Sequence, residues 1–124
     1  MTRTFKSGLI VAVMAMLAAP ASAAPPPVGH EDHEIMAPHH DWVRKLQANG
    51  RLCCDWSDTR PVQVRTQGGR YQVRFRLDQV FGAPVGVWLD VPDDAVIRTA
   101  NPIGVAIASY YAGRVQCFVP ASDG

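Results

Sequence analysis

All four histidines of the chain lie in one short stretch, interleaved with acidic side chains: His30, His33, His39 and His40. Imidazole nitrogens and carboxylate oxygens are therefore concentrated in a single segment, and such ligands suit zinc, copper or nickel. The four histidines are a candidate site for zinc or copper. The competing interpretation is a solvated linker rich in histidine, because no predicted element holds the ligands and a disordered segment loses chain entropy on binding.

Three cysteines offer a second kind of chemistry, and two of them are adjacent: Cys53, Cys54 and Cys117. Adjacent cysteines can close a strained ring, ligate a soft metal, or let one thiol pair at long range while its neighbour faces the other way. A bridge from Cys117 to either neighbour closes a loop of about sixty residues, for which chain entropy gives roughly 4 kcal/mol of stability. We therefore predict a disulfide of Cys117, with Cys54 as the preferred partner and Cys53 as the other candidate. The remaining thiol is either buried and inert or exposed and able to link two chains.

A run of arginines between residues 60 and 76 forms a third group. In the hairpin predicted below, Arg74 and Arg76 point the same way and Arg65 stands close by across the strand pair. These three are candidate binding residues for an acidic partner. The competing interpretation is a solvated strand face, because charged residues on an exposed sheet also prevent edge association. The aromatic residues do not alternate with the arginines in a stacking pattern, so we predict no nucleic-acid partner.

The N-terminal segment 1–23 has the three-part order of a cleavable signal peptide. Arg3 and Lys6 form a basic region, an apolar run extends over 9–19, and small residues over 21–23 form a cleavage site. The apolar run is shorter than the about 20 residues that span a bilayer, so we expect no membrane span after processing. We predict cleavage after Ala23 and a periplasmic or secreted mature protein, in a compartment where disulfides persist.

The mature chain divides into a leader, one small domain and a tail. Residues 24–40 are rich in proline, charge and histidine and carry few bulky apolar groups, so we predict a disordered leader. Residues 41–120 carry the patterns of a small β domain, and 121–124 form a short tail. The charges of the mature chain nearly balance, which gives no reason to expect nucleic acid or anionic lipid as a partner.

The segment 61–76 predicts its own hairpin around a two-residue turn at Gly68-Gly69. Every second cross-strand pair then lies on one face: Val62 with Phe75, Val64 with Val73 and Thr66 with Tyr71. The intervening pairs are all polar: Gln63 with Arg74, Arg65 with Gln72 and Gln67 with Arg70. This register predicts one face in the core and the other in solvent.

The flanking segments complete the predicted fold. Before the hairpin, Trp42, Leu46 and Gly50 predict a short helix that ends at a left-handed glycine. After it, the alternation over 87–91 predicts a third strand with Val87, Leu89 and Val91 inward, followed by a turn that begins at Pro92.

A second hairpin is expected over 104–120 around Ala112-Gly113, with Ala108 facing Cys117 and Tyr110 facing Val115. The predicted fold is mainly β: a small antiparallel sheet or barrel of about five strands with one short N-terminal helix, stapled by a disulfide.

The order of short motifs resembles a group of small uncharacterised exported proteins of alphaproteobacteria. The motifs are HDWVRKL, CC, RPV, a hairpin, VW-DVPDD, GVAIASYY and a final CFVP, and they span roughly residues 40–120. Members of that group carry further cysteines near the positions held here by Thr59 and Ser109. This chain lacks both, so the second disulfide that the resemblance implies for those members is absent. The resemblance supports compartment and fold and leaves function open.

Catalytic groups are scarce in the predicted domain. After His40 there is no histidine, after Glu34 no glutamate, and Lys45 is the only lysine beyond the signal peptide. A cysteine nucleophile would have to take its histidine partner from the leader. We therefore predict a non-catalytic exported binding or interaction domain, not an enzyme, with an envelope or extracellular protein as its expected partner. The alternative is a periplasmic metal-binding protein that uses the histidines of the leader.

Overall fold

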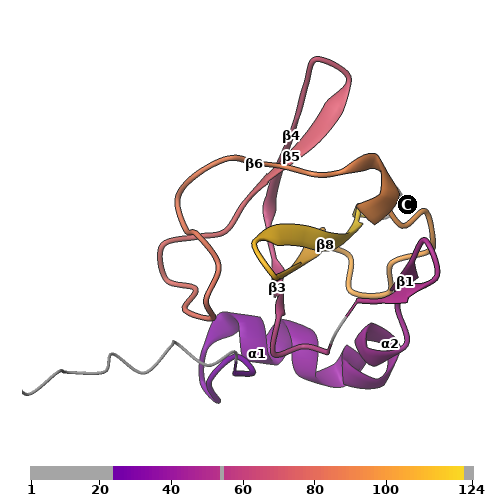
Figure 1. The fold of residues 1–124 in the computed structure, drawn as a ribbon. Coiled ribbons are helices and arrows are strands. Elements are labelled where there is room, and N and C mark those ends of the chain that lie inside the picture. The colour runs from indigo at the N-terminus through magenta and orange to yellow at the C-terminus, as the bar shows by residue number, and fades with distance from the viewer. Residues whose placement is uncertain (1–23, 54, 122–124) are drawn as a thin grey trace, which may run out of the picture.

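The computed structural model describes residues 24–53 and 55–121 (Figure 1). The predicted signal peptide, Cys54 and residues 122–124 of the predicted tail lie outside the described residues. Within the described ranges, no helix combines the length and the apolar character that crossing a membrane requires.

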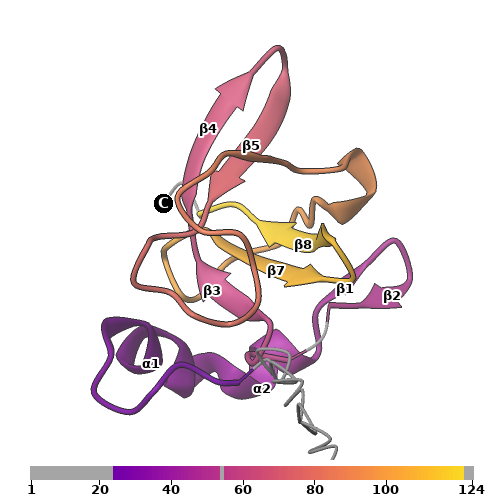
Figure 2. The ribbon, with the colours of Figure 1, turned by 60° about the vertical axis from the view of Figure 1, so that its left-hand side comes forward.

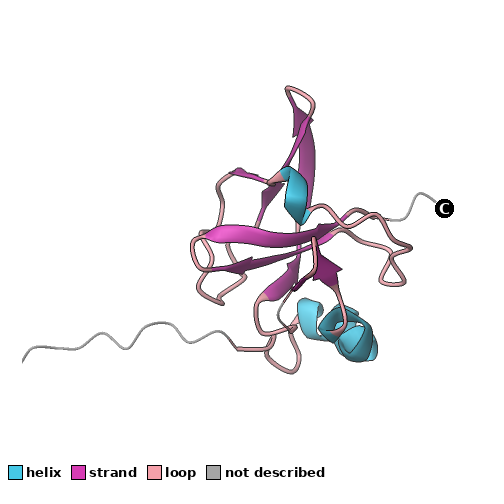
Figure 3. Ribbon diagram, turned by 45° about the vertical axis from the view of Figure 1, so that its right-hand side comes forward, coloured by secondary structure: helices cyan, strands magenta, loops and turns pink. Residues whose placement is uncertain are grey.

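The described residues fold into a mainly β, disulfide-stapled domain with three small antiparallel sheets (Figure 3). The first sheet pairs β1 (Gln47–Ala48) with β2 (Arg51–Leu52). The second has the order β3 (Thr59–Pro61), β7 (Ile107–Tyr111), β8 (Arg114–Val119). The third has the order β4 (Gln63–Gln67), β5 (Arg70–Arg74), β6 (Leu89–Asp90). The fold class is the predicted one, and the strands form three short sheets where one small sheet or barrel of about five strands was expected.

Helical turns cover residues 31–44 and pack at one end of the sheets (Figure 2). They are α1 (Glu31–Met36), the 3-10 turn η1 (Ala37–His39) and α2 (His40–Arg44). Most of the segment 24–40 is thus folded, in contrast to the disordered leader that its composition predicts. The reason is that Met36 is fully buried in the core and that the carboxylate of Asp32 accepts hydrogen bonds from Arg76 and Gln79.

The predicted helix around Trp42 is shorter than the pattern indicates at its C-terminal end. α2 ends at Arg44, and Asn49-Gly50 forms the turn between β1 and β2. Both turn residues have positive φ, 51° at Asn49 and 76° at Gly50, as a two-residue hairpin turn of this kind requires. The prediction of a left-handed Gly50 is confirmed, but the residue turns a hairpin and does not stop a helix.

The β4–β5 hairpin has the predicted register from Gln67–Arg70 at the turn to Gln63–Arg74 at the base. The hairpin projects from the body of the molecule (Figure 1), and all five residues of β4 are exposed. Its apolar face is therefore only partly covered. Val73 is fully buried, whereas Val64 keeps 39% of its surface exposed.

The third predicted strand forms only over β6, which pairs with β5. Val91 is buried as expected and Leu89 is half-buried, whereas Val87 is exposed because the chain before β6 is a loop. The turn expected after Pro92 is present as the 3-10 turn η2 (Asp93–Ala95).

The β7–β8 hairpin follows the predicted register only near its turn. Beyond Tyr110 a β-bulge shifts the pairing by one residue, so that Cys117 faces Ser109 and not Ala108. The unpaired residue of β8 is Gln116, which lies between the two registers. Alternation alone does not reveal the bulge here, because Val115, Cys117, Phe118 and Val119 are all apolar and therefore fit either register.

Two hydrophobic clusters share β7 and β8. One surrounds Phe75 and Phe118, and the other surrounds Met36, Val43 and the disulfide. The disulfide joins Cys53 to Cys117. The prediction that Cys117 is bridged is confirmed.

The preference for Cys54 as the partner of Cys117 is wrong. The physical reason lies in the residues that precede it. Leu52 at the end of β2 points outward with 65% of its surface exposed, and the next residue, Cys53, therefore points inward and is buried. The backbone N–H of Cys53 is also held by the carbonyl oxygen of Leu46 at 3.0 Å.

Candidate functional site: an arginine–tryptophan face on the β4–β5 hairpin

Two guanidinium groups and one indole ring meet on the polar face of the β4–β5 hairpin. Arg65 and Arg74 lie diagonally across the strand pair, since Arg65 is paired with Gln72 and Arg74 with Gln63. Trp88, from the loop before β6, lies against both. Its ring centroid is 4.3 Å from the guanidinium carbon of Arg65 and 4.6 Å from that of Arg74. Such cation–π contacts contribute about 0.5–1 kcal/mol each at exposed sites. We call these five residues the arginine–tryptophan face.

Hydrogen bonds hold both arginine side chains in place. The Nε of Arg65 donates to Oε1 of Gln72 at 2.7 Å. The Nε of Arg74 donates to Oε1 of Gln63, also at 2.7 Å. Gln72 is itself fixed, because its Nε2 donates to Asp90 of β6 at 2.8 Å. Each guanidinium is therefore oriented through its Nε, and its two terminal nitrogens stay available to a ligand.

The charge of this face determines what it can bind. Among the described residues, neither Arg65 nor Arg74 forms an ion pair with a carboxylate. Arg70, which is exposed, adds a third cation on the same side of the hairpin. A guanidinium presents parallel N–H groups that match the two oxygens of a carboxylate or phosphate. The face is thus suited to an anionic ligand with more than one negative charge.

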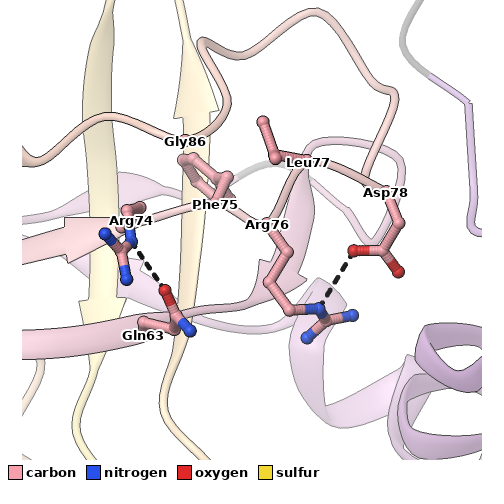
Figure 4. Close-up of a pocket in the computed structure, with 7 residues that line it drawn as sticks. All are labelled: Gln63, Arg74, Phe75, Arg76, Leu77, Asp78 and Gly86. Carbon is pink, nitrogen blue, oxygen red and sulfur yellow. Dashed lines mark hydrogen bonds and ion pairs between the residues drawn. The ribbon is translucent and has the colours of Figure 1, made fainter.

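A hollow extends from this face toward the base of the hairpin (Figure 4). It has a volume of about 500 Å³ and is lined by Gln63, Arg74, Phe75, Arg76, Leu77, Asp78 and Gly86. The side chain of Leu77 is 78% exposed and packs over Gly86. A side chain at position 86 would collide with it, because its Cβ would lie only 2.8 Å from Cδ2 of Leu77. The hollow is thus lined by an exposed apolar side chain, Leu77, as well as by the charged side chains of Arg74, Arg76 and Asp78.

The structure places Arg76 in an internal ion-pair network. Its Nη2 is 2.6 Å from Asp32, which is 1% exposed, and its Nε donates to Asp78 at 3.1 Å (Figure 4). Burial alone would lower the pKa of Arg76, but the hydrogen bonds and charges of Asp32 and Asp78 outweigh it and raise that pKa. The hydrogen bond from Arg76 holds the pKa of Asp78 below its ordinary value. The charge of Arg76 is thus balanced inside the protein.

Arg60, which sequence reasoning grouped with the other arginines, is buried. Its Nη1 donates to the carbonyl oxygen of Trp56 at 2.7 Å, and its Nη2 donates to that of Ala24 at 2.6 Å. Its guanidinium carbon lies 4.5 Å from the ring centroid of Phe81. Burial lowers the pKa of Arg60. This arginine ties the start of the described chain to the core and is covered from solvent.

The histidines predicted as metal ligands are spread along the helical segment. His30 caps the start of α1, and His39 ends η1. His33 and His40 both contact the ring of Trp56, at centroid distances of 5.4 Å and 4.8 Å. Across residues 24–53 and 55–121, no three or more His, Cys, Asp or Glu side chains gather closely enough to hold a metal ion. Binding of zinc or copper stays a prediction.

Gln63, Gln72 and Trp88 were not among the predicted binding residues, and Trp88 is the one that contacts both guanidinium groups. The signal was present in the alternation over 87–91, because a strand with Val87 and Leu89 inward turns Trp88 and Asp90 toward the polar side. That side is also the one predicted for Arg65 and Arg74.

A scan against protein-family models, a search of curated proteins and a search of solved structures each found no match to this chain. The resemblance to small exported alphaproteobacterial proteins stays a prediction.

Proposed function

We propose that this protein is a non-catalytic binding domain that recognises an acidic partner protein in the cell envelope or outside the cell. The arginine–tryptophan face is its recognition surface. One observation carries the proposal. The guanidinium groups of Arg65 and Arg74 are held by Trp88 and two glutamines, yet neither forms an ion pair with a carboxylate of the described residues.

The fixed geometry favours recognition over a merely solvated strand face. Arginines on a merely solvated face keep their rotamer entropy, because nothing orders their side chains. For an arginine this entropy is worth about 2 kcal/mol. Here the cation–π contacts and the Nε hydrogen bonds order both side chains in advance. A ligand that binds ordered groups loses less entropy, so pre-organisation raises its affinity.

The expected compartment rests on two features. The sequence of residues 1–23 has the pattern of a signal peptide, and the Cys53–Cys117 disulfide is of the kind that persists in oxidising compartments. N-terminal sequencing of the exported protein should begin at Ala24. Exported material that still begins at Met1 would count against this part of the proposal.

Calorimetric titration with a short polyglutamate peptide tests the proposed surface. The Arg65→Gln/Arg74→Gln double variant should bind the peptide roughly tenfold or more weakly than the unaltered protein, since two charge-assisted contacts are lost. The matched control is Arg44→Gln/Lys45→Gln at the end of α2, which removes the same charge from two exposed positions. This control should stay within about twofold, because exposed charges far from a site contribute little. Equal losses in both variants, or no binding by the unaltered protein, would refute the proposal.

A further inference from the structure

The free edge of β4 lies directly beside the arginine–tryptophan face. β4 is the end strand of the order β4-β5-β6, and all five of its residues are exposed. An edge strand presents backbone N–H and C=O groups that another extended chain can pair with. Figures 1 and 2 both show the β4–β5 hairpin projecting from the rest of the domain, so this edge is open to an approaching chain.

The register determines which backbone groups point outward. In an antiparallel hairpin with a two-residue turn, the pair beside the turn is hydrogen-bonded, and bonded pairs then alternate with non-bonded ones. The pairs of Gln67, Arg65 and Gln63 with β5 are thus the bonded ones. Val64 and Thr66 turn their N–H and C=O groups away from β5, toward the free edge.

A hydrogen bond at the base of the hairpin supports this assignment. Val62 belongs to the same alternating set as Val64 and Thr66, and its N–H donates outward to the carbonyl oxygen of Ala106 at 3.0 Å. Further along the strand, the outward backbone groups of Val64 and Thr66 have no partner among the described residues. The open part of the edge therefore begins at Val64 and ends at the Gly68-Gly69 turn.

We propose that an extended acidic segment of the partner protein adds to this edge as a further strand, with backbone hydrogen bonds to Val64 and Thr66. The inference rests on the proposed function and specifies the form in which the acidic partner is bound. Strand addition takes affinity from the backbone and specificity from alternate side chains. Both contributions are available here, because the free edge and the unpaired cations belong to one hairpin.

The two faces of β4 predict the alternation of the added segment. On one face its side chains would meet Arg65 and the neighbouring Arg74, which calls for Asp or Glu. On the other face they would lie beside Val64, which is 39% exposed, and Thr66, which calls for an apolar or β-branched residue. A second copy of this chain fits less well, since it would bring the arginines of two hairpins together.

The first test uses a short peptide of alternating threonine and glutamate and two derivatives of it. One derivative is N-methylated at every threonine and the other at every glutamate, so that each has lost the donors of one strand edge. Strand addition uses only one edge, so one derivative should lose binding by roughly tenfold or more while the other retains it. Equal binding of both derivatives and the parent peptide would overturn the inference.

The second test alters the protein. Thr66→Pro removes an outward N–H and leaves the hydrogen bonds between β4 and β5 intact, a position where an edge strand tolerates proline. It should weaken binding of the threonine–glutamate peptide roughly tenfold, whereas the control Thr66→Ala should stay within about twofold. Circular dichroism of both variants checks that the domain is folded. If Thr66→Pro is unfolded, the methylated peptides, which are tested on the unaltered protein, decide whether the segment adds as a strand.

The outcomes separate this inference from the proposed function. If Arg65→Gln/Arg74→Gln abolishes binding but N-methylation and Thr66→Pro do not, the side chains bind an acidic chain without strand addition, and only the inference fails. If an alternating threonine–glutamine peptide binds as well as the glutamate one, the proposed function fails. Concentration-dependent dimerisation that Thr66→Pro abolishes would assign the edge to a second copy and would also overturn the inference.

Discussion

Asp32 lies in the first turn of α1, and its carboxylate accepts hydrogen bonds from Arg76 and Gln79 in the segment that follows β5. Gln79 also donates to the carbonyl oxygen of Pro61 at 2.8 Å. A buried carboxylate is stable only when it is paired and hydrogen-bonded, and both conditions are met here. One residue thereby joins the histidine-rich segment to two parts of the β domain.

Replacing Asp32 by alanine should lower the free energy of unfolding by about 3 kcal/mol, because the variant leaves Arg76 and Gln79 without their buried acceptor. Urea denaturation measures the change. The control is Glu31→Ala at the adjacent exposed position, which should change stability by no more than about 0.5 kcal/mol. Similar stabilities of the two variants would show that residues 24–40 do not fold onto the domain.

The sequence showed that arginines are concentrated in one segment, but not which of them are buried, ion-paired or exposed. The arginines between 60 and 76 look equivalent in the sequence. In the structure Arg60 is buried against backbone carbonyls and Arg76 is paired with Asp32, whereas Arg65 and Arg74 contact Trp88 and form no ion pair with a described carboxylate. The partition depends on contacts with segments far away in the chain, which a local pattern does not contain.

At the scale of elements, the β4–β5 hairpin was predictable because both determinants of its register are local. Gly68-Gly69 sets the turn, and the alternation on either side agrees with it. The β7–β8 register was predictable only as far as Tyr110, because the residues of β8 beyond the bulge are apolar on both faces and fit either register. The role of Asn49-Gly50 was not predictable either, because a left-handed conformation occurs both at helix ends and in hairpin turns.

The uneven cover of the hairpin gives a prediction for its apolar face. Val73→Asp places a charge at a fully buried position and should unfold the domain, whereas Val64→Asp falls on a surface that is 39% exposed and should cost about 1 kcal/mol. Thermal denaturation of the two variants measures the difference. Comparable losses would mean that β4 is covered by the body of the protein, contrary to the structure.

The pairing of β3 with β7 gives a second prediction at this scale. Thr59 and Ser109 face each other and are both buried. The N–H of Tyr110 donates to the carbonyl oxygen of Asp58, so the neighbouring pair is hydrogen-bonded. Because bonded and non-bonded pairs alternate, Thr59 and Ser109 form a non-hydrogen-bonded pair. Side chains approach most closely in such pairs, within the range that a disulfide spans.

The Thr59→Cys/Ser109→Cys variant should therefore form a second disulfide and gain roughly 2 kcal/mol of stability. Peptide mapping without reductant identifies the bond. The single variants serve as controls, since each adds a thiol without the partner. Two free thiols at positions 59 and 109 in the double variant would show that the β3–β7 register is wrong.

At the scale of the whole molecule, the Cys53–Cys117 disulfide joins the segment after β2 to the last strand, inside the cluster that also holds Met36 and Val43. Cys117→Ser should lower the free energy of unfolding by about 2–5 kcal/mol, as for native bridges in small secreted domains. Chemical denaturation measures the change, with Cys54→Ser as the matched control. An equal loss from Cys54→Ser, or a mapped bond between Cys54 and Cys117, would contradict this account.

The central claim is that an acidic partner binds the arginine–tryptophan face, and an NMR titration of the isotope-labelled mature protein with a short polyglutamate peptide tests it most directly. The spectrum resolves the indole N–H groups of the three tryptophans and the backbone amides in one experiment. On binding, the indole signal of Trp88 and the amide signals of β4 and β5 should shift together, while the indole signals of Trp42 and Trp56 stay unchanged. Shifts centred on Trp56 and the histidine-rich segment, or small shifts spread over every exposed arginine, would contradict the claim.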